Sequence, residues 1–149
     1  MKFVKTLVIL GILAGLSFAS TIGFIDVEQV FTGYSQTKSA QDEINNKMRD
    51  YQRALSKYQQ ELEIARIDGK SERDIERIRE RMQKELDPKE AEIRMLNEEQ
   101  MSRIRRDIVT AVEAVAKEVG ISVVVDKQVI IAGGIDITET VITRLNRRR

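Results

Sequence analysis

The central part of the chain carries hydrophobic residues at helical spacing. From Ala40 to Ala65, apolar positions step by three or four residues with a mean of about 3.6, the period of one narrow apolar stripe on an α-helix. This first stripe consists of Ala40, Ile44, Met48, Tyr51, Leu55, Tyr58, Leu62 and Ala65. The spacing predicts a helix over 37–67 that buries one seam and leaves its other faces in water.

The stripe stops at Asp68-Gly69-Lys70 and then resumes. Gly69 suits a helix C-cap, and Ser71 followed by Asp74 is typical of a capping box that starts a new helix. The second stripe consists of Ile75, Ile78, Met82, Leu86, Ile93, Leu96, Met101, Ile104, Ile108, Ala111, Val115 and Val119. The two stripes predict an antiparallel, coiled-coil-like hairpin over 37–118 with its tip near 68–71. At 1.5 Å per residue, such an arm is roughly 45–50 Å long.

Pro88 interrupts the second stripe and allows two interpretations. Asp87 could cap a fresh helix that has Pro88 in its first turn, or Pro88 could kink one continuous helix. We favour the kink, because the periodicity continues on both sides of Pro88.

The two flanking segments, 20–36 and 119–149, are apolar and predict one β-rich head. Residues 22–26 indicate a strand, and Asp26 can cap a short helix after it. Residues 122–126 and 129–132 are rich in β-branched side chains and predict two more strands, while Thr138 is expected to cap a last helix. The candidate core residues of the head are Ile22, Phe24, Val123, Val125 and Ile130.

The size of the head predicts self-association. The two segments hold about 48 residues, and a unit that small, without disulfides or metal, usually needs oligomerisation to complete its core. The predicted fold class is therefore mostly α with a small β part. Several copies would share one head, and each copy would carry a long helical arm.

The N-terminus has the three parts of a secretory signal peptide. Lys2 and Lys5 precede an uncharged run rich in Leu and Ile, and small residues at Ser17 and Ala19 suit cleavage after Ala19. The alternative is an uncleaved anchor, since residues 6–25 are uncharged, but the apolar core of this run ends at Leu16. We therefore expect residues 1–19 to be removed and the mature chain to be periplasmic.

Composition excludes most catalytic classes. The 149 residues include 25 Lys+Arg and 24 Asp+Glu but no Cys, His or Trp. This rules out a disulfide, a Cys-linked lipid, a Ser-His-Asp relay and a Cys or His metal ligand. Aromatic residues make up 5%, too few for a stacking platform on single-stranded nucleic acid. With no phosphate-loop pattern and no convergent pair of carboxylates, we expect no enzyme, cofactor, metal or nucleic-acid partner.

The order of parts resembles the Skp/OmpH family of periplasmic chaperones. The likeness is carried by residues 22–26 with Val30, Phe31 and Tyr34, by residues 121–127, and by residues 134–138 with Val141, Leu145 and Asn146. By this resemblance, three chains form a homotrimer whose strands build a shared barrel and whose arms enclose a cavity. The family holds unfolded outer-membrane β-barrel proteins there without ATP, which implies binding through many weak contacts.

The charge of the arm departs from the strongly basic character of that family. Residues 37–118 hold 18 basic and 19 acidic residues, and the tip from 66 to 84 holds seven basic and five acidic residues. Long-range electrostatic steering should therefore be weak. No lipopolysaccharide site is carried over, and contact with an anionic membrane surface is expected to be weak at most.

The client-contact candidates are Met95, which lies beside the second stripe, and the tip residues Arg66, Lys70, Arg73 and Arg77. The plainer interpretation of the tip cations is a solvated face that is paired with Glu72, Glu76 and Glu80. Met48 and Met82 lie on the stripes, and we expect them to pack in the seam.

Two functions from different classes remain open. The first is an ATP-independent holdase for unfolded envelope proteins, which should bind many unfolded chains. The alternative is a structural adaptor whose hairpin docks to one folded partner of the cell envelope. A cytosolic hairpin chaperone of the prefoldin type shares the general shape, but the signal peptide argues against it.

Overall fold

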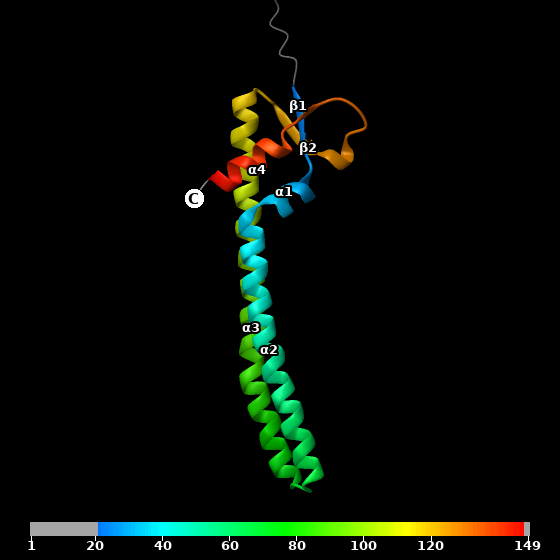
Figure 1. Cartoon of the computed structure of the whole chain (residues 1–149), viewed down its shortest axis with the longest axis vertical. Helices are drawn as coiled ribbons and strands as arrows, with labels where there is room; N and C mark the ends of the chain where they lie inside the picture. Colours follow the sequence, from blue (N-terminus) through cyan, green and yellow to red (C-terminus); the bar gives the residue numbers. More distant parts are fainter. Residues whose placement is uncertain (1–20, 148–149) are drawn as a thin grey trace, which may run out of the picture.

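The computed structural model describes residues 21–147. In chain order it contains β1 (Ile22–Ile25), α1 (Val27–Gly33), α2 (Ser35–Ile67), α3 (Glu72–Val119), β2 (Val123–Asp126), the 3-10 helix η1 (Lys127–Val129), β3 (Ile135–Asp136) and α4 (Thr138–Arg147). A long helical hairpin projects from a small head that contains both ends of the described chain (Figure 1). The predicted fold class, mostly α with a small β part, is confirmed for the single chain. The predicted signal peptide lies outside the described residues.

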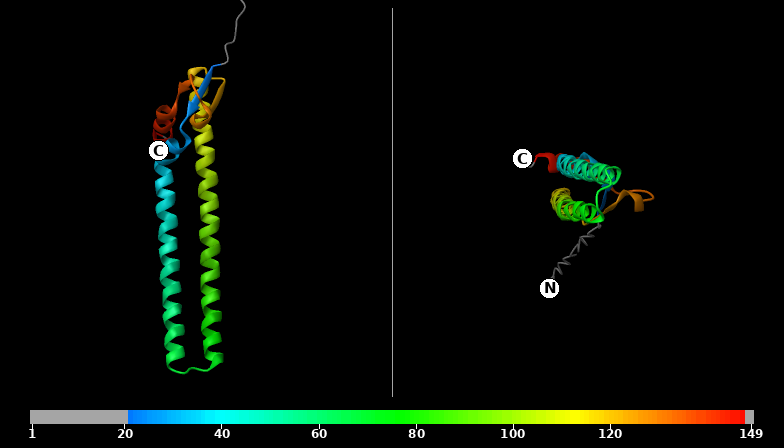
Figure 2. Two further views of the ribbon diagram at one scale, coloured as in Figure 1. Left: turned by 90° about the vertical axis from the view of Figure 1, so that its right-hand side faces the viewer. Right: turned by 90° about the horizontal axis from the view of Figure 1, so that it is seen from below.

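The arm is formed by α2 and α3, which run antiparallel and side by side (Figure 2). With 33 residues, α2 is about 50 Å long, in agreement with the length expected from the stripe. With 48 residues, α3 is longer, and its last turns continue into the head (Figure 1). The arm and the head therefore share one rigid element.

The hairpin turn has the local chemistry that the sequence predicts. Gly69 has a φ of +65°, and the N–H of Lys70 donates to the carbonyl oxygen of Ala65 at 2.9 Å, which closes a Schellman motif. Ser71 then caps α3, because its Oγ accepts the N–H of Asp74 at 3.3 Å. Both caps predicted at this turn are confirmed.

The seam between α2 and α3 is packed in two separate clusters. Near the head, Ala40 and Ile104 join the head core, while Tyr58, Ala65, Ile75 and Ile78 form a second cluster toward the tip, with Met82 packed against it. Met82 thus lies in the seam as predicted. The same prediction for Met48 is wrong, since Met48 is 42% exposed. It lies between the two clusters, beside a cavity of about 290 Å³, where the seam is loosely filled and the long side chain reaches solvent.

Pro88 lies inside α3, and the helix continues from Glu72 to Val119 without interruption. A fresh helix beginning at Pro88 is therefore wrong, and the continuous helix is confirmed. The helix ends where Gly120 adopts a φ of +76°, as its position after the second stripe predicts.

The head contains a three-stranded parallel sheet in the order β2-β1-β3. The N-terminal strand β1 is central and pairs Ile22 with Val123 on one side and Phe24 with Asp136 on the other. Helices α1 and α4 and the end of α3 pack around the sheet (Figure 1). Val30, Val115 and Val141 are fully buried between them, and this is the centre of the head core.

The predicted strand over 129–132 is wrong. The side chain of Asp126 accepts the N–H of Gln128 at 3.1 Å and caps the 3-10 helix η1, which ends at Val129, the first residue of the predicted strand. Val129 is then 69% exposed and Ile131 is fully exposed. A preference for strands depends on packing against neighbours, and no strand pairs with this segment within the described chain. The third strand forms later, at β3.

The predicted cap at Thr138 is also wrong, because Thr138 is the first residue of α4. Asp136 takes the capping role and accepts the N–H of Thr138 at 2.9 Å. The hydroxyl oxygen of Thr138 accepts the N–H of Asp26 at 3.0 Å instead. The side chain is used to join the two ends of the chain rather than to start a helix.

A capping residue that is distant in sequence fixes the start of the arm. The side-chain oxygen of Asn146 accepts the N–H of Ser35 at 2.9 Å, and its amide donates to the carbonyl oxygen of Gly33 at 2.8 Å. Helix α2 therefore begins at Ser35 rather than at the predicted residue 37. The contact joins α4 to the junction between head and arm.

Candidate functional site

The tip of the arm presents exposed isoleucines among cations. Ile64 is 58% exposed and Ile67 is 76% exposed, and both lie off the buried seam. Ile64 also lines a shallow cavity of about 460 Å³ together with Lys70 and Arg77. Sequence reasoning missed these two isoleucines, although their positions outside the stripe of apolar residues were a usable signal. An apolar surface with cations around it can contact an extended chain of mixed composition.

The predicted tip cations differ in how they are paired. Arg66 lies 3.8 Å from Glu63, and Arg77 lies 3.3 Å from Asp74. Lys70 and Arg73 form no salt bridge within the described part of the chain. The neighbouring Arg79 and Arg81 are paired with Glu76 and Glu61. Much of the tip is therefore a solvated, paired surface, and its contact with a client stays a prediction.

Met95 is the most exposed methionine on the arm, at 62%. It lies on α3 away from both seam clusters, as its place beside the second stripe predicts. Together with Met48, it puts flexible, polarizable side chains on the middle of the arm. Its role as a client contact stays a prediction.

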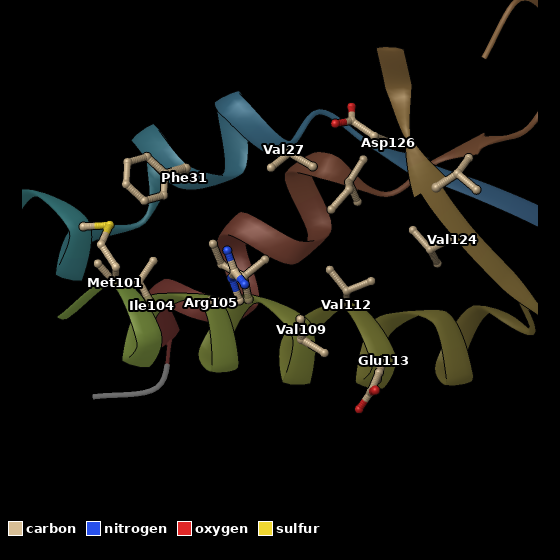
Figure 3. A pocket seen from close by; sticks show the side chains of 13 residues that line it. Val27, Phe31, Met101, Ile104, Arg105, Val109, Val112, Glu113, Val124 and Asp126 are labelled. Carbon is tan, nitrogen blue, oxygen red and sulfur yellow. The ribbon is translucent and has the colours of Figure 1, made fainter. Parts of the chain in front are cut away.

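The head contains an apolar pocket with a volume of about 560 Å³. It lies between α1, α3 and β2 (Figure 3). Its apolar lining includes Phe31, Met101, Ile104, Ile108, Val112 and Val124. Arg105, Glu113 and Asp126 also contribute to its lining. Below, we call this concavity the head pocket.

The five predicted core residues of the head are not buried in the single chain. Ile22 is 47% exposed and Val123 is 48% exposed, while Phe24, Val125 and Ile130 are half-buried. The buried positions are their neighbours Ile25, Ile121 and Ile137, together with residues of α1 and α4. Whether the five residues become buried between copies stays a prediction.

A polar network joins the strands of the head at the start of α1. The carboxylate of Asp26 accepts the N–H of Gln29 at 3.0 Å and receives the ammonium of Lys127 at 3.3 Å. These two donors hold the pKa of Asp26 below its ordinary value. Hydrogen bonds from the hydroxyl and the N–H of Thr138 lower the pKa of Asp136 in the same way. Both carboxylates are therefore structural.

This network predicts that acid destabilises the head. Folded pKa values below the unfolded value of about 3.9 give stability that is fully present above that pH and is lost as the pH falls through the folded pKa. In Asp26→Asn, the amide oxygen can still cap α1, but the ion pair with Lys127 is lost. When melting is followed by circular dichroism, Asp26→Asn should have a lower melting temperature than the wild type at neutral pH. Its melting temperature should also fall less steeply as the pH is lowered. Asp68→Asn at the tip should follow the wild type, and a D26N profile parallel to the wild type would contradict the assignment.

A second carboxylate contact closes the distal half of the arm. The hydroxyl of Tyr58 donates to Glu85 Oε2 at 2.8 Å across the seam. This hydrogen bond, together with burial and the negative charge of Glu85, raises the pKa of Tyr58. Tyr34 makes a comparable contact with Asp107 at 3.0 Å near the head. The two tyrosines thus connect α2 to α3 at both ends of the arm.

Tyr58→Phe is expected to loosen the distal arm. The raised pKa means that the contribution of Tyr58 is present below its unfolded value of about 10 and is lost as the pH rises through the folded pKa. The variant should melt a few degrees lower at neutral pH and lack that alkaline loss. Tyr51→Phe is the matched control, since the Tyr51 hydroxyl makes no hydrogen bond within the described chain. Equal melting of the two variants would show that the Glu85 contact contributes nothing.

The described residues contain no group of three or more Asp or Glu side chains placed to hold a metal ion. Within residues 21–147, no helix is long and apolar enough to span a bilayer. The described residues instead provide surfaces for binding, namely an arm with exposed apolar side chains and a head with an apolar pocket.

The chain is similar to known proteins both in its sequence profile and in its fold. The profile of the family described as outer membrane protein (OmpH-like) matches residues 21–145. No curated protein sequence gives a significant match. Among solved structures, the chain is similar to a candidate outer membrane chaperone (OmpH-like) from Caulobacter crescentus CB15. The two chains are 14% identical with a TM-score of 0.54, and the match covers 86% of this chain and 85% of that chain. At this identity, the structural likeness concerns the fold.

Proposed function

Since this chain belongs to the OmpH-like family, whose role is that of a chaperone, we propose that it is an ATP-independent holdase of the periplasm. Its clients are unfolded outer-membrane β-barrel proteins, which it keeps from aggregating. The proposal includes self-association as a homotrimer, in which three arms surround the client. The structural neighbour from Caulobacter crescentus, itself a candidate outer membrane chaperone, supports the same reading.

The observation that carries the proposal is the surface of the arm. Ile64, Ile67 and Met95 are more than half exposed; the two isoleucines lie at the tip of a hairpin about 50 Å long, and Met95 lies nearer its middle. They do not form one deep site, so each can make only a weak and rapidly exchanging contact. Several arms acting together raise the total affinity without any single tight contact. Such binding requires no nucleotide and leaves the client free to be released.

The absence of Trp from the chain makes the proposal directly testable. An outer-membrane β-barrel protein that contains Trp is unfolded in urea and diluted into buffer with the processed chain. Client Trp emission and light scattering are followed together, so that all Trp emission belongs to the client. We expect suppressed scattering and shifted emission at about one trimer per client. A folded protein that contains Trp serves as the control and should give no change.

The opposite outcome favours the adaptor alternative. If the client aggregates as it does alone while the chain stays folded, the holdase proposal is wrong. An adaptor would instead bind one folded envelope protein at a fixed ratio. Sedimentation with folded envelope proteins would then identify the partner.

A further inference from the structure

The side chains of this protein that an oxidant can attack are few. The sequence contains no Cys, His or Trp, which leaves methionine and tyrosine. Of the three tyrosines, Tyr34 and Tyr58 are buried, and each donates its hydroxyl to a carboxylate. The sulfur atoms of methionine are therefore the main targets for an oxidant that reaches the chain.

The four methionines of the described chain differ in how far solvent reaches them. Met95 is 62% exposed and Met48 is 42% exposed, and we call these two residues the exposed pair. Met82 packs against the cluster toward the tip. Met101 packs against the head core and lines the head pocket (Figure 3). Since Met82 and Met101 are only half-buried, the contrast with the exposed pair is one of rate.

The exposed pair lies at one level of the arm. Lys47 donates from Nζ to Glu92 Oε1 at 2.5 Å, which places these two residues opposite each other on α2 and α3. Met48 follows Lys47 directly, and Met95 lies three positions after Glu92. The two methionines are therefore separated by about one helical turn along the arm. An oxidant that modifies both changes one band around the middle of the arm.

The exposed pair can take up oxygen without loss of the fold. Met48 lies beside the cavity of about 290 Å³ that Tyr51 and Ile93 also line, so an added oxygen atom has room and meets solvent. Met95 lies outside both seam clusters. By contrast, a polar oxygen on Met82 would enter an apolar cluster, where an unpaired polar group costs free energy. Oxidation of the exposed pair therefore changes the surface of the arm and leaves its seam intact.

We propose that Met48 and Met95 are a modification site, at which a peroxide converts each thioether to a sulfoxide and thereby lowers the affinity of the arm for unfolded clients. With hydrogen peroxide, the oxygen–oxygen bond breaks and one oxygen atom becomes bonded to sulfur. The sulfur gives up an electron pair and is oxidised, while the peroxide is reduced and leaves as water. The inference rests on the proposed function and adds a means of regulating it.

The expected direction follows from the polarity of the sulfoxide. Oxidation turns a flexible apolar side chain into a polar one, and a polar group must lose water to lie against an apolar segment of a client. Because the client is held by many weak contacts, loss of two of them on each arm lowers its affinity without closing the rest of the surface. Methionine sulfoxide reductases reverse the change, so the site can be reset.

The order of oxidation tests the site without any client. The processed wild type is treated with hydrogen peroxide, and digested samples taken over time are examined by mass spectrometry for the gain of one oxygen atom. Met95 and Met48 should be oxidised at least about fivefold faster than Met82 and Met101. In the chain unfolded by urea, the four rates should become equal. Equal rates in the folded chain would overturn the assignment of the site.

The effect on clients is tested with chains that cannot be oxidised at chosen positions. Each chain is treated, freed of peroxide and compared with itself before treatment, so that any effect of the substitution itself cancels. The apparent affinity of the wild type for an unfolded client, measured by suppression of light scattering, should fall at least about threefold. A chain with Met48→Leu and Met95→Leu should keep its own affinity. The matched control, with Met82→Leu and Met101→Leu, should fall like the wild type.

Two further results would overturn the inference. One is an unchanged affinity of the wild type when both members of the exposed pair are fully oxidised. The other is loss of the helical signal in circular dichroism after oxidation of the exposed pair, because the modification would then act on the fold. If the untreated wild type gives no protection at all, the holdase proposal fails and the effect on clients fails with it. The order of oxidation is measured independently, so the two failures are distinguishable.

Discussion

Removing five helical turns from each arm helix is expected to abolish protection of unfolded outer-membrane proteins while the head stays folded. The segments to remove are 48–65 and 76–93, which face each other across the seam, since Tyr58 contacts Glu85. Each segment has 18 residues, so each cut shortens the arm by about 27 Å and preserves the helical face. The turn residues and the Ser71 cap are kept, and Lys47 takes the backbone position of Ala65 ahead of the turn.

The reason for the expected loss is the number of contacts. The cut removes Met48 and Ile64 and much of the surface between tip and head, so the summed weak contacts fall below what holds a client. Scattering of a diluted client should return close to that of the client alone. Sedimentation should show an unchanged oligomer. A full-length chain with Ile64→Ser and Ile67→Ser is the companion variant and should give an intermediate loss.

Retained protection by the shortened chain would contradict the role of the arm. The client would then be held by the head, and the exposed residues of the arm would need another explanation. Loss of the oligomer in the shortened chain would instead show that the arms contribute to assembly. Protection of the client therefore tests whether the arm is a binding surface, and the oligomeric state tests whether the arm supports assembly.

Val141→Asp is expected to unfold the head with the arm still helical. Val141 is fully buried with Val30 and Val115, and burying an unpaired charge there costs about 4 kcal/mol or more. A head this small has little stability to lose. The cluster around Tyr58 and Ile78 is separate, so most of the helical signal should remain.

Limited proteolysis and circular dichroism measure this effect. The head segments of Val141→Asp should be cleaved rapidly, while a fragment containing the arm persists. Thr143→Asp places the same charge on the exposed face of the same helix and should resist cleavage like the wild type. Equal cleavage of the two variants would show that the buried valine cluster does not hold the head together.

The arm could be predicted from the sequence because its determinants are local. The stripes, the Gly69 turn and the Ser71 cap all act within a few residues, and the structure shows each of them in place. Pro88 lies inside the continuous helix α3, as the periodicity on both sides of it predicts, although proline usually breaks or kinks a helix. The prediction that Met48 packs in the seam was wrong because the stripe does not show how closely the facing helix approaches at each turn.

The head could be predicted only in outline, because its determinants are distant. Thr138 bonds Asp26 across 112 positions, and Asn146 bonds Ser35 across 111 positions. Local rules predict that a threonine just before a helix caps that helix. The sequence near Thr138 does not indicate that its hydroxyl accepts the N–H of Asp26 instead. The segment 129–132 has the composition of a strand, but no strand pairs with it within the described chain, so propensity alone predicted the wrong element.

The candidate site was only partly visible for a similar reason. Met95 was predicted as a client contact because it lies next to a stripe, and Arg66, Lys70, Arg73 and Arg77 were predicted because the charges of the tip can be read from the sequence. Ile64 and Ile67 were not predicted, because the stripe identifies the apolar residues that face the seam and not those on the other faces of the helix. The head pocket could not be foreseen, since it arises where α1, α3 and β2 meet.

The central position of β1 in the sheet has a consequence for the order of folding during synthesis. Both neighbours of β1 come from the last part of the chain, with Ile22 opposite Val123 and Phe24 opposite Asp136. A growing chain can close its hairpin from contacts near in sequence, but its first strand must wait until more than a hundred further residues have been made. A nascent chain stopped short of β3 therefore presents finished arms on an unfinished head. The sheet of the head can therefore be completed only after β3 has been made, whereas the contacts that close the hairpin are available earlier in the chain.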